Sequence, residues 1–220
     1  MASAWLRWLW TTDGGLAVRI AIGGAILATL AVADLRRNRR RATRWKEYAF
    51  LLAGTAAAMA YALANDMVTV TISPLYFQVH EGLEAMPDSI RAVAAGVALK
   101  GAWSAGLILS VAMLIANNPR KGSPRLPQRR MYVKFAWPLA GAVAMSAALG
   151  VMAQAGWLGG AGVADGQLRR FLIVARIHLG VYIGGAVGTV AAVVAILRER
   201  RKMGATMSEG EEEGGRADRR

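Results

Sequence analysis

The stretch Asn65–Phe77, NDMVTVTISPLYF, decides how the chain is divided, because it stands between two long apolar runs. Its centre, residues 68–73, alternates apolar and polar side chains, and this period of two predicts an extended segment. Pro74 lacks an amide donor and biases Ser73 toward extended geometry, so no helix is expected to continue through this point. Because polar non-helical backbone cannot face lipid, we expect the segment to cover the outer ends of a helix bundle.

The composition is typical of a polytopic membrane protein. Hydrophobic residues make up 55% of the 220 residues, and the mean hydropathy is +0.33. The net charge of +13 would suggest nucleic acid as the partner of a soluble protein. Here the charge lies in short blocks between apolar runs, so we predict contact with the lipid bilayer and no nucleic-acid partner. Cysteine is absent, which excludes disulfides and thiolate metal sites.

Apolar runs long enough to cross a bilayer define the predicted fold class, an all-α polytopic bundle of about five transmembrane helices. The expected spans are residues 15–35, 48–66, 90–116, 135–157 and 171–197. We divide the chain into an N-terminal helix with a basic loop (1–46), a four-helix membrane core (47–197) and a disordered charged tail (198–220). The extended segment lies on the outer side of this core.

Three basic segments, residues 36–46, 120–134 and 198–202, fall on the same side of the predicted membrane. Positively charged loops stay in the cytoplasm, so we predict an inner-membrane protein with its N-terminus outside and its C-terminus cytoplasmic. Ala31-Val32-Ala33 also resembles a signal-peptide cleavage site. Cleavage there would export a strongly basic terminus, so we expect the first span to be retained.

Small residues repeat every fourth position on two of the spans, which allows close approach of helix backbones in lipid. The two ladders are Gly54, Ala58, Ala62, Asp66 and Arg176, Gly180, Gly184, Gly188. Each ladder ends in a charge, and the two charges have opposite sign. Packing ladder against ladder would bring Asp66 and Arg176 to similar depth as an ion pair.

Lys100 lies about nine residues inside the third span, roughly 14 Å from its outer end at 1.5 Å per residue. An ammonium group at that depth requires a partner or water, and Asp66 is the expected partner. A snorkelling lysine with a purely structural carboxylate partner is the alternative. The predicted polar cluster therefore contains Asp66, Lys100 and Arg176, with Tyr76 and His178 nearby.

His178 and Tyr182 stand four residues apart on the fifth span, where they can pair with each other or face another helix. Imidazole can ligate a metal or haem, or carry protons. His178 is a weak metal candidate, and His80 in the outer loop is a second. No recognised metal, nucleotide or hydrolase motif accompanies them, so the cofactor stays unknown.

Two stretches resemble the motifs of a family of uncharacterised bacterial multi-pass membrane proteins. Residues 66–77 are similar to its signature D-Q-[IV]-T-x-x-[IV]-S-P-E-Y-F, and residues 178–185 to its last-helix motif H-x-x-x-Y-x-x-G. The resemblance covers residues 48–197 and implies a four-helix core, with no established activity. Met67 and Leu75 replace the glutamine and glutamate of the signature, so a site that used those groups is altered here.

The leading functional hypothesis is a non-catalytic membrane module, either a subunit of a larger assembly or a binder of a small ligand. Its partners would be the bilayer, other membrane subunits or further copies of itself. One alternative is a transporter that uses Lys100 and Arg176 for an anionic solute. Another is a haem- or metal-binding membrane enzyme that uses His178.

Overall fold

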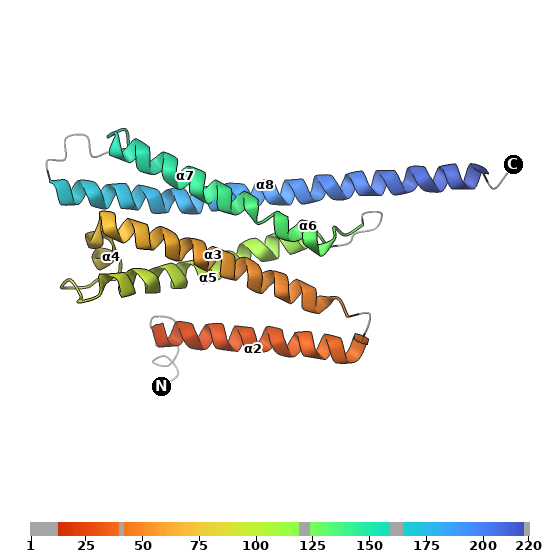
Figure 1. The fold of residues 1–220 in the computed structure, drawn as a ribbon, viewed down its shortest axis with the longest axis horizontal. Coiled ribbons are helices and arrows are strands. Elements are labelled where there is room, and N and C mark those ends of the chain that lie inside the picture. The colour runs from red at the N-terminus through yellow and green to blue at the C-terminus, as the bar shows by residue number, and fades with distance from the viewer. Residues whose placement is uncertain (1–12, 40–41, 119–123, 159–164, 218–220) are drawn as a thin grey trace. The chain divides into compact units, whose positions relative to one another are not determined.

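The structure is a computed structural model, and it describes residues 13–39, 42–118, 124–158 and 165–217. Within these ranges the backbone is helical and contains no strand, which confirms the predicted all-α fold class. In chain order the helices are α2 (Asp13–Asn38), α3 (Arg44–Ile72), α4 (Pro74–His80), α5 (Ile90–Ala116), α6 (Gln128–Val133), α7 (Ala136–Gln154) and α8 (Gly166–Ala217) (Figure 1).

Five helical segments among the described residues are long and apolar enough to cross a membrane, as the sequence predicts. They are Ala17–Asn38, Arg44–Ile72, Ile90–Ala116, Gln128–Gln154 and Gly166–Thr206. The shortest has 22 residues. At 1.5 Å per residue it measures about 33 Å, and the hydrocarbon core of a bilayer is about 30 Å thick. The architecture is therefore consistent with an integral membrane protein.

Helix α3 does not end near Asp66 but continues to Ile72, so the extended segment predicted for residues 65–77 is wrong. Ser73 alone is extended, with φ −145° and ψ 92°, which is the geometry favoured before a proline. Pro74 then opens α4, in the first turn, where its missing amide group breaks no helical hydrogen bond. The break at Pro74 is thus confirmed, but it occupies a single residue.

Burial along the end of α3 follows the helical period. Asp66, Thr69 and Val70 are buried together, whereas Val68 is 62% exposed. The hydroxyl groups of Thr69 and Thr71 donate to carbonyl oxygens three residues earlier, at 3.4 and 2.6 Å, and so stay satisfied within a helix. A β-branched residue costs a helix no more than about 0.7 kcal/mol, less than an unsatisfied backbone group costs in lipid.

The chain forms two compact units, Met1–Ile108 and Leu109–Arg220. In the first unit, α5 crosses α3 at Gly106. A Cβ atom added to Gly106 would stand 2.8 Å from both the Ala58 Cβ and the Thr55 Cα atoms. The small residues of α3 therefore serve the close packing of α3 with α5.

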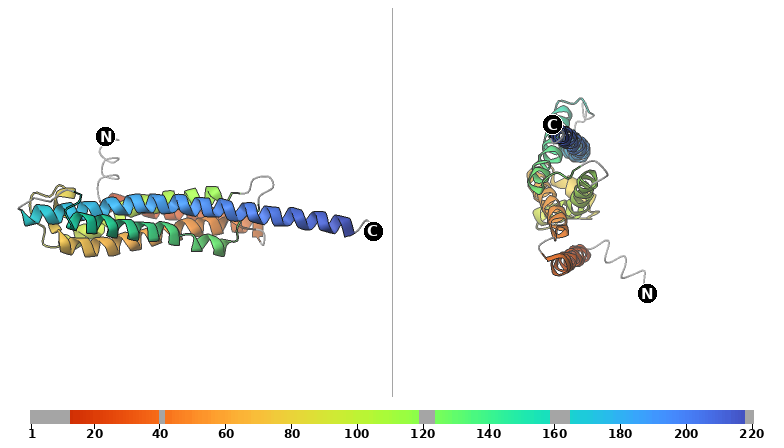
Figure 2. Two further views of the ribbon diagram at one scale, coloured as in Figure 1. Left: turned by 90° about the horizontal axis from the view of Figure 1, so that it is seen from above. Right: turned by 90° about the vertical axis from the view of Figure 1, so that its right-hand side faces the viewer.

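In the second unit, α7 and α8 pack as an antiparallel pair (Figures 1 and 2). Along α8, Gly180 approaches Met145 and Ser146, Gly184 approaches Gly141, and Gly188 approaches Trp137 and Pro138. Helices joined by a short connection pack locally, because neighbours in sequence become neighbours in space. The predicted packing of the α8 ladder against the α3 ladder is therefore wrong, since each ladder has another partner.

Helix α8 is longer than its predicted span. Its start is fixed by Asp165, whose Oδ1 accepts the amide of Gln167 at 2.8 Å as an N-cap. It continues to Ala217, whereas the sequence predicts a disordered tail over residues 198–220. Residues 198–206 are rich in Arg, Glu, Lys, Met and Ala, which are good helix formers. Parts of the predicted outer turn (158–166) and of the basic loop (120–134) lie outside the described residues.

Candidate functional site

Helix α4 packs against the ends of α3 and α5 in the first unit. Val70, Phe77 and Ala94, one from each helix, form a buried apolar cluster, and Tyr76 packs against it. The rings of Tyr76 and Phe77 meet edge to face, with 5.3 Å between their centroids. The cap that the sequence predicts over these helix ends is therefore a short helix held by apolar contacts.

Lys100 forms an ion pair with Glu81, and its Nζ atom lies 2.9 Å from Glu81 Oε2. Glu81 is the C-terminal cap of α4, so the pair ties this end of α4 to α5. The sequence predicts Asp66 as the partner of Lys100, and the structure pairs Lys100 with Glu81. The reason is local: a helical α4 places Glu81 beside α5, which an extended segment would not do.

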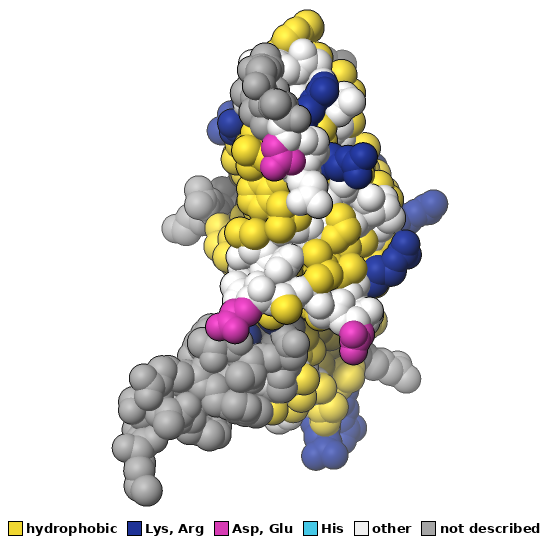
Figure 3. Space-filling model, turned by 90° about the vertical axis from the view of Figure 1, so that its left-hand side faces the viewer, with side chains coloured by type: hydrophobic (Ala, Val, Ile, Leu, Met, Phe, Trp, Pro, Cys, Tyr) yellow, Lys and Arg dark blue, Asp and Glu magenta, His cyan; other side chains and the backbone are white. Residues whose placement is uncertain are grey.

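The loop after α4 carries two further acids, Glu84 and Asp88, which are exposed. Figure 3 faces the side of the molecule where Figure 1 draws α4, and it shows acidic side chains as separate groups among apolar ones. Glu81 differs from these acids, because its side chain and that of Lys100 are only 27% exposed. The ion pair thus belongs to the cap and not to the solvated loop.

Asp66 lies on α3 and is 4% exposed. Its Oδ1 accepts a hydrogen bond from Asn65 Nδ2 at 3.1 Å, and its carbonyl oxygen accepts one from the Thr69 hydroxyl. A buried carboxylate requires a donor such as the Asn65 amide group, because burial removes its hydration. Asp66 is therefore a buried side chain of α3, and its place in a polar cluster with Arg176 stays a prediction.

His80, a weak metal candidate, ends α4 and is exposed. Its ring stacks on that of Tyr76, with 5.8 Å between centroids and 13° between planes. Across the residues that the structure describes, no three His, Asp or Glu side chains are placed to hold a metal ion.

Two arginines of α8 donate to carbonyl oxygens at the end of α7 and in the turn that follows it. Arg169 donates to the Gln154 carbonyl oxygen at 2.8 Å, and Arg176 donates to the Leu158 carbonyl oxygen at 3.1 Å. The last carbonyl groups of a helix lack intrahelical donors, and cations are favourable there. Arg176 thus has a structural contact of its own within the second unit.

His178 and Tyr182 occupy different environments although they are one turn apart on α8. His178 is buried, whereas Tyr182 is 64% exposed. A tyrosine so exposed on a membrane-spanning helix is suited to contact with lipid or with another protein.

A polar network that was not predicted from the sequence lies at the turn between α2 and α3. Asp34 is buried there, and its two carboxylate oxygens accept hydrogen bonds from Asn38 Nδ2 at 2.6 Å and from the Arg44 amide at 2.9 Å. The signal was available, because Asp34 and Asn38 stand four apart, on the same face of a helix.

A second missed network lies in the second unit, at the end of α5. Asn117 exchanges two hydrogen bonds with the backbone of Leu126, at 2.8 and 3.2 Å. Arg200 of α8 donates to the carbonyl oxygens of Ala116 and Pro124, the latter at 3.0 Å. Glu199, which precedes Arg200 in the sequence, forms an ion pair with Lys134. Arg200 of the basic segment 198–202 is therefore a buried side chain that holds α8 to the end of α5.

Two expectations about the site stay predictions. Asp66 and Arg176 belong to different units, so their ion pair is one of them. The other is the family resemblance of residues 66–77 and 178–185. Comparison of the chain with family models, with curated proteins and with solved structures gives no match.

We expect the pair Lys100–Glu81 to stabilise the cap measurably. In a double-mutant cycle with Lys100→Met and Glu81→Gln, the coupling energy should be about 1 kcal/mol, the upper range for a partly exposed ion pair. The measurement is the free energy of unfolding in mild detergent, followed by circular dichroism during titration with a denaturing detergent.

Glu84→Gln is the matched control, because it removes the same charge from an exposed site three residues away. Its coupling to Lys100→Met should be close to zero. Equal coupling for Glu81 and Glu84 would show a general charge effect in place of a specific pair.

Proposed function

We propose that this chain is a non-catalytic module of a bacterial inner membrane, which acts as a subunit beside other membrane subunits. One observation carries the proposal: Lys100, the deepest base of the predicted cluster, is used to hold α4 on α5 through Glu81. The contact of Arg176 supports the same interpretation, because its guanidinium group donates to the Leu158 carbonyl oxygen and so joins α8 to the segment after α7. An ion pair that holds two helices together needs no substrate.

The proposed orientation places the N-terminus outside and the C-terminus in the cytoplasm. It is supported by the basic segments 36–46, 120–134 and 198–202, which alternate with loops of little positive charge. The α4 cap would then lie on the outer side. A cysteine introduced at Glu84 should be labelled by a membrane-impermeant thiol reagent in intact cells with a permeable outer membrane, because the wild-type chain has no cysteine.

Helix α8 offers a surface for the proposed partner. Its exposed apolar side chains alternate at spacings of four and three residues: Ile183, Val187, Val190, Val194 and Leu197. This spacing is that of a helix-packing seam. Gly180, Gly184 and Gly188 of α8 face α7, so the stripe remains for another helix or for lipid.

The proposal predicts that other membrane proteins, or further copies of the chain, co-purify with it from its native membrane. Val190→Trp should reduce the recovered partner at least about tenfold, because a bulky ring disrupts close packing at a helix seam. The measurement is quantitative mass spectrometry of the tagged protein after gentle solubilisation.

Val151→Trp is the matched control, because Val151 on α7 is 70% exposed and Val190 is 63% exposed. This variant should keep its partner. A chain that is recovered alone and monomeric, with or without these substitutions, contradicts the subunit proposal.

A second candidate function, transport of a small anion, is favoured by one observation. The side chains of Lys100 and Glu81 remain partly exposed, so an anion could replace the carboxylate beside the ammonium group. Uptake of anions into proteoliposomes should then be lost in Lys100→Met and kept in Arg91→Met, which removes an exposed charge from the same helix.

A further inference from the structure

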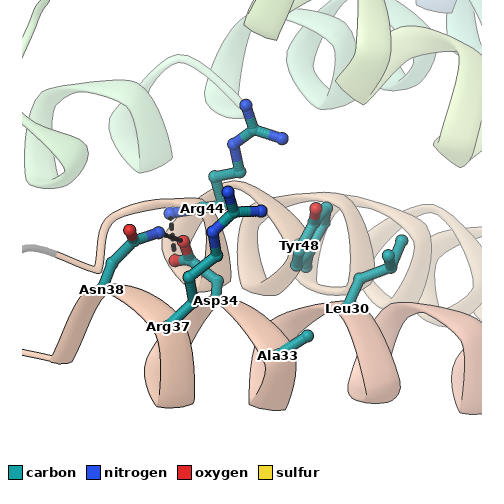
Figure 4. Close-up of a pocket in the computed structure, with 7 residues that line it drawn as sticks. All are labelled: Leu30, Ala33, Asp34, Arg37, Asn38, Arg44 and Tyr48. Carbon is teal, nitrogen blue, oxygen red and sulfur yellow. Dashed lines mark hydrogen bonds between the residues drawn. The ribbon is translucent and has the colours of Figure 1, made fainter.

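A cavity of about 490 Å³ lies where α2 and α3 meet at their connecting turn. Leu30 and Ala33 of α2 and Tyr48 of α3 provide its apolar wall, and Arg37 and Arg44 provide a basic rim (Figure 4). We call it the arginine cavity. It combines an apolar surface with cations, as a site for an amphipathic anion requires.

The two arginines of the rim are available for a ligand. Their side chains extend from α2 and α3 in the same direction (Figure 4). Neither guanidinium group makes a hydrogen bond or an ion pair with a residue that the structure describes. A guanidinium group presents paired donors that match the oxygens of a phosphate.

The acid of the cavity, Asp34, does not neutralise this rim by direct contact. Its two oxygens are engaged by Asn38 and by the backbone amide of Arg44, so it holds the turn in place (Figure 4). The surrounding segment, residues 36–46, carries further arginines and a lysine, so the local charge stays strongly positive. An anion is therefore the favoured occupant.

An exposed apolar stripe on α2 leads to the cavity. Ile22, Ile26 and Leu30 are each about half exposed and stand four residues apart. From Ile22 to Leu30 the stripe measures about 12 Å, close to the roughly 15 Å of one leaflet's hydrocarbon layer. Trp45 beside the cavity is also exposed, as is usual for aromatic side chains at a membrane interface. A free phosphate would use the rim alone, whereas a lipid would use the rim and the stripe.

We infer that the arginine cavity binds the phosphate of an anionic phospholipid, whose acyl chain lies along Ile22, Ile26 and Leu30. Arg37 and Arg44 hold the phosphate from two helices. The bound lipid thereby joins the first span to the second at the membrane surface. The inference does not depend on the function proposed above.

The test is native mass spectrometry of the full chain in detergent, titrated with phosphatidylglycerol, phosphatidylcholine or inorganic phosphate. We expect one retained phosphatidylglycerol, with phosphatidylcholine bound more weakly. The double variant Arg37→Gln/Arg44→Gln should lose phosphatidylglycerol affinity about tenfold more than Arg36→Gln/Arg39→Gln, which removes the same charge from outside the cavity.

If the two double variants lose equal phosphatidylglycerol affinity, the inference is overturned, because the lipid is then attracted by the general positive charge of the segment and not by the cavity. Displacement of phosphatidylglycerol by an equal concentration of inorganic phosphate would overturn the lipid as the ligand. If Arg37→Gln/Arg44→Gln fails to fold, Ala33→Leu tests the cavity with both arginines present. The larger leucine side chain should fill part of the arginine cavity and so weaken lipid retention. Unchanged retention would count against lipid binding in this cavity.

Discussion

Gly184→Ala is expected to separate α7 from α8 and to cost about 2 kcal/mol or more of the free energy of unfolding, as for an overpacked interior. The added Cβ atom would overlap the carbonyl oxygen of Gly141 and stand 2.8 Å from the Met145 Cβ atom. The oxygen is part of a helix backbone and cannot rotate away, so the helices must move apart. The measurement is denaturing-detergent titration of the purified protein, followed by circular dichroism.

Gly185→Ala supplies an unusually close control, because an added Cβ atom there meets nothing within 4 Å. Alanine has the higher helix propensity, so this variant should be neutral or slightly more stable. Similar losses for the two substitutions would contradict the tight crossing, since the loss would then reflect glycine itself and not its neighbour.

The α7–α8 crossing also shows what the sequence could predict about packing. Close approach at Gly180 and Gly184 was predicted, but the partner helix was wrong. A third ladder was present on α7, where Pro138, Ala142 and Ser146 recur every fourth residue and are buried. Spacing identifies which faces pack closely, and the short connection between α7 and α8 favours their pairing. Applying both criteria together would have selected α7.

Spans were easier to predict than the end of a span. The 27 residues of α5 coincide with the predicted run, because apolar length alone decides membrane insertion. Residues 68–73 at the end of α3 fit both the helical period of 3.6 residues and the strand period of two. The prediction followed the period of two. Backbone hydrogen bonding decides in favour of the helix, since the threonine hydroxyls bond within it and only Pro74 interrupts the chain of amides.

The candidate site was predicted in part. The burial of Asp66 and the need of Lys100 for a carboxylate follow from the cost of charge in lipid. The identity of Glu81 as partner does not, because it depends on α4 being helical and on its position over α5. Arg200 is one of four basic residues in the segment 198–202, and in the sequence all four are equally suited to serve as topology signals. A charge pattern alone cannot show which of several arginines is buried.

Arg200→Met is expected to destabilise the second unit by about 3 kcal/mol, from two hydrogen bonds made by a charged donor. The Arg200 side chain is almost completely buried and donates to Ala116 at the end of α5 and to Pro124 in the following loop. Methionine keeps much of the side-chain volume, so the carbonyl oxygens lose their donor without a large cavity being formed. The measurement is the free energy of unfolding, together with proteolysis of the loop between α5 and α6, which should become faster.

Arg201→Met separates this structural role from the general role of positive charge. Arg201 is exposed, and its substitution removes the same charge from the same basic segment. Its unfolding free energy should change by less than about 0.5 kcal/mol, as for most surface substitutions. If both variants insert with wild-type topology but only Arg200→Met loses stability, the basic segment combines a redundant orientation signal with one arginine that fixes α8 to the end of α5. Equal stability of the two variants would instead assign Arg200 to the orientation signal.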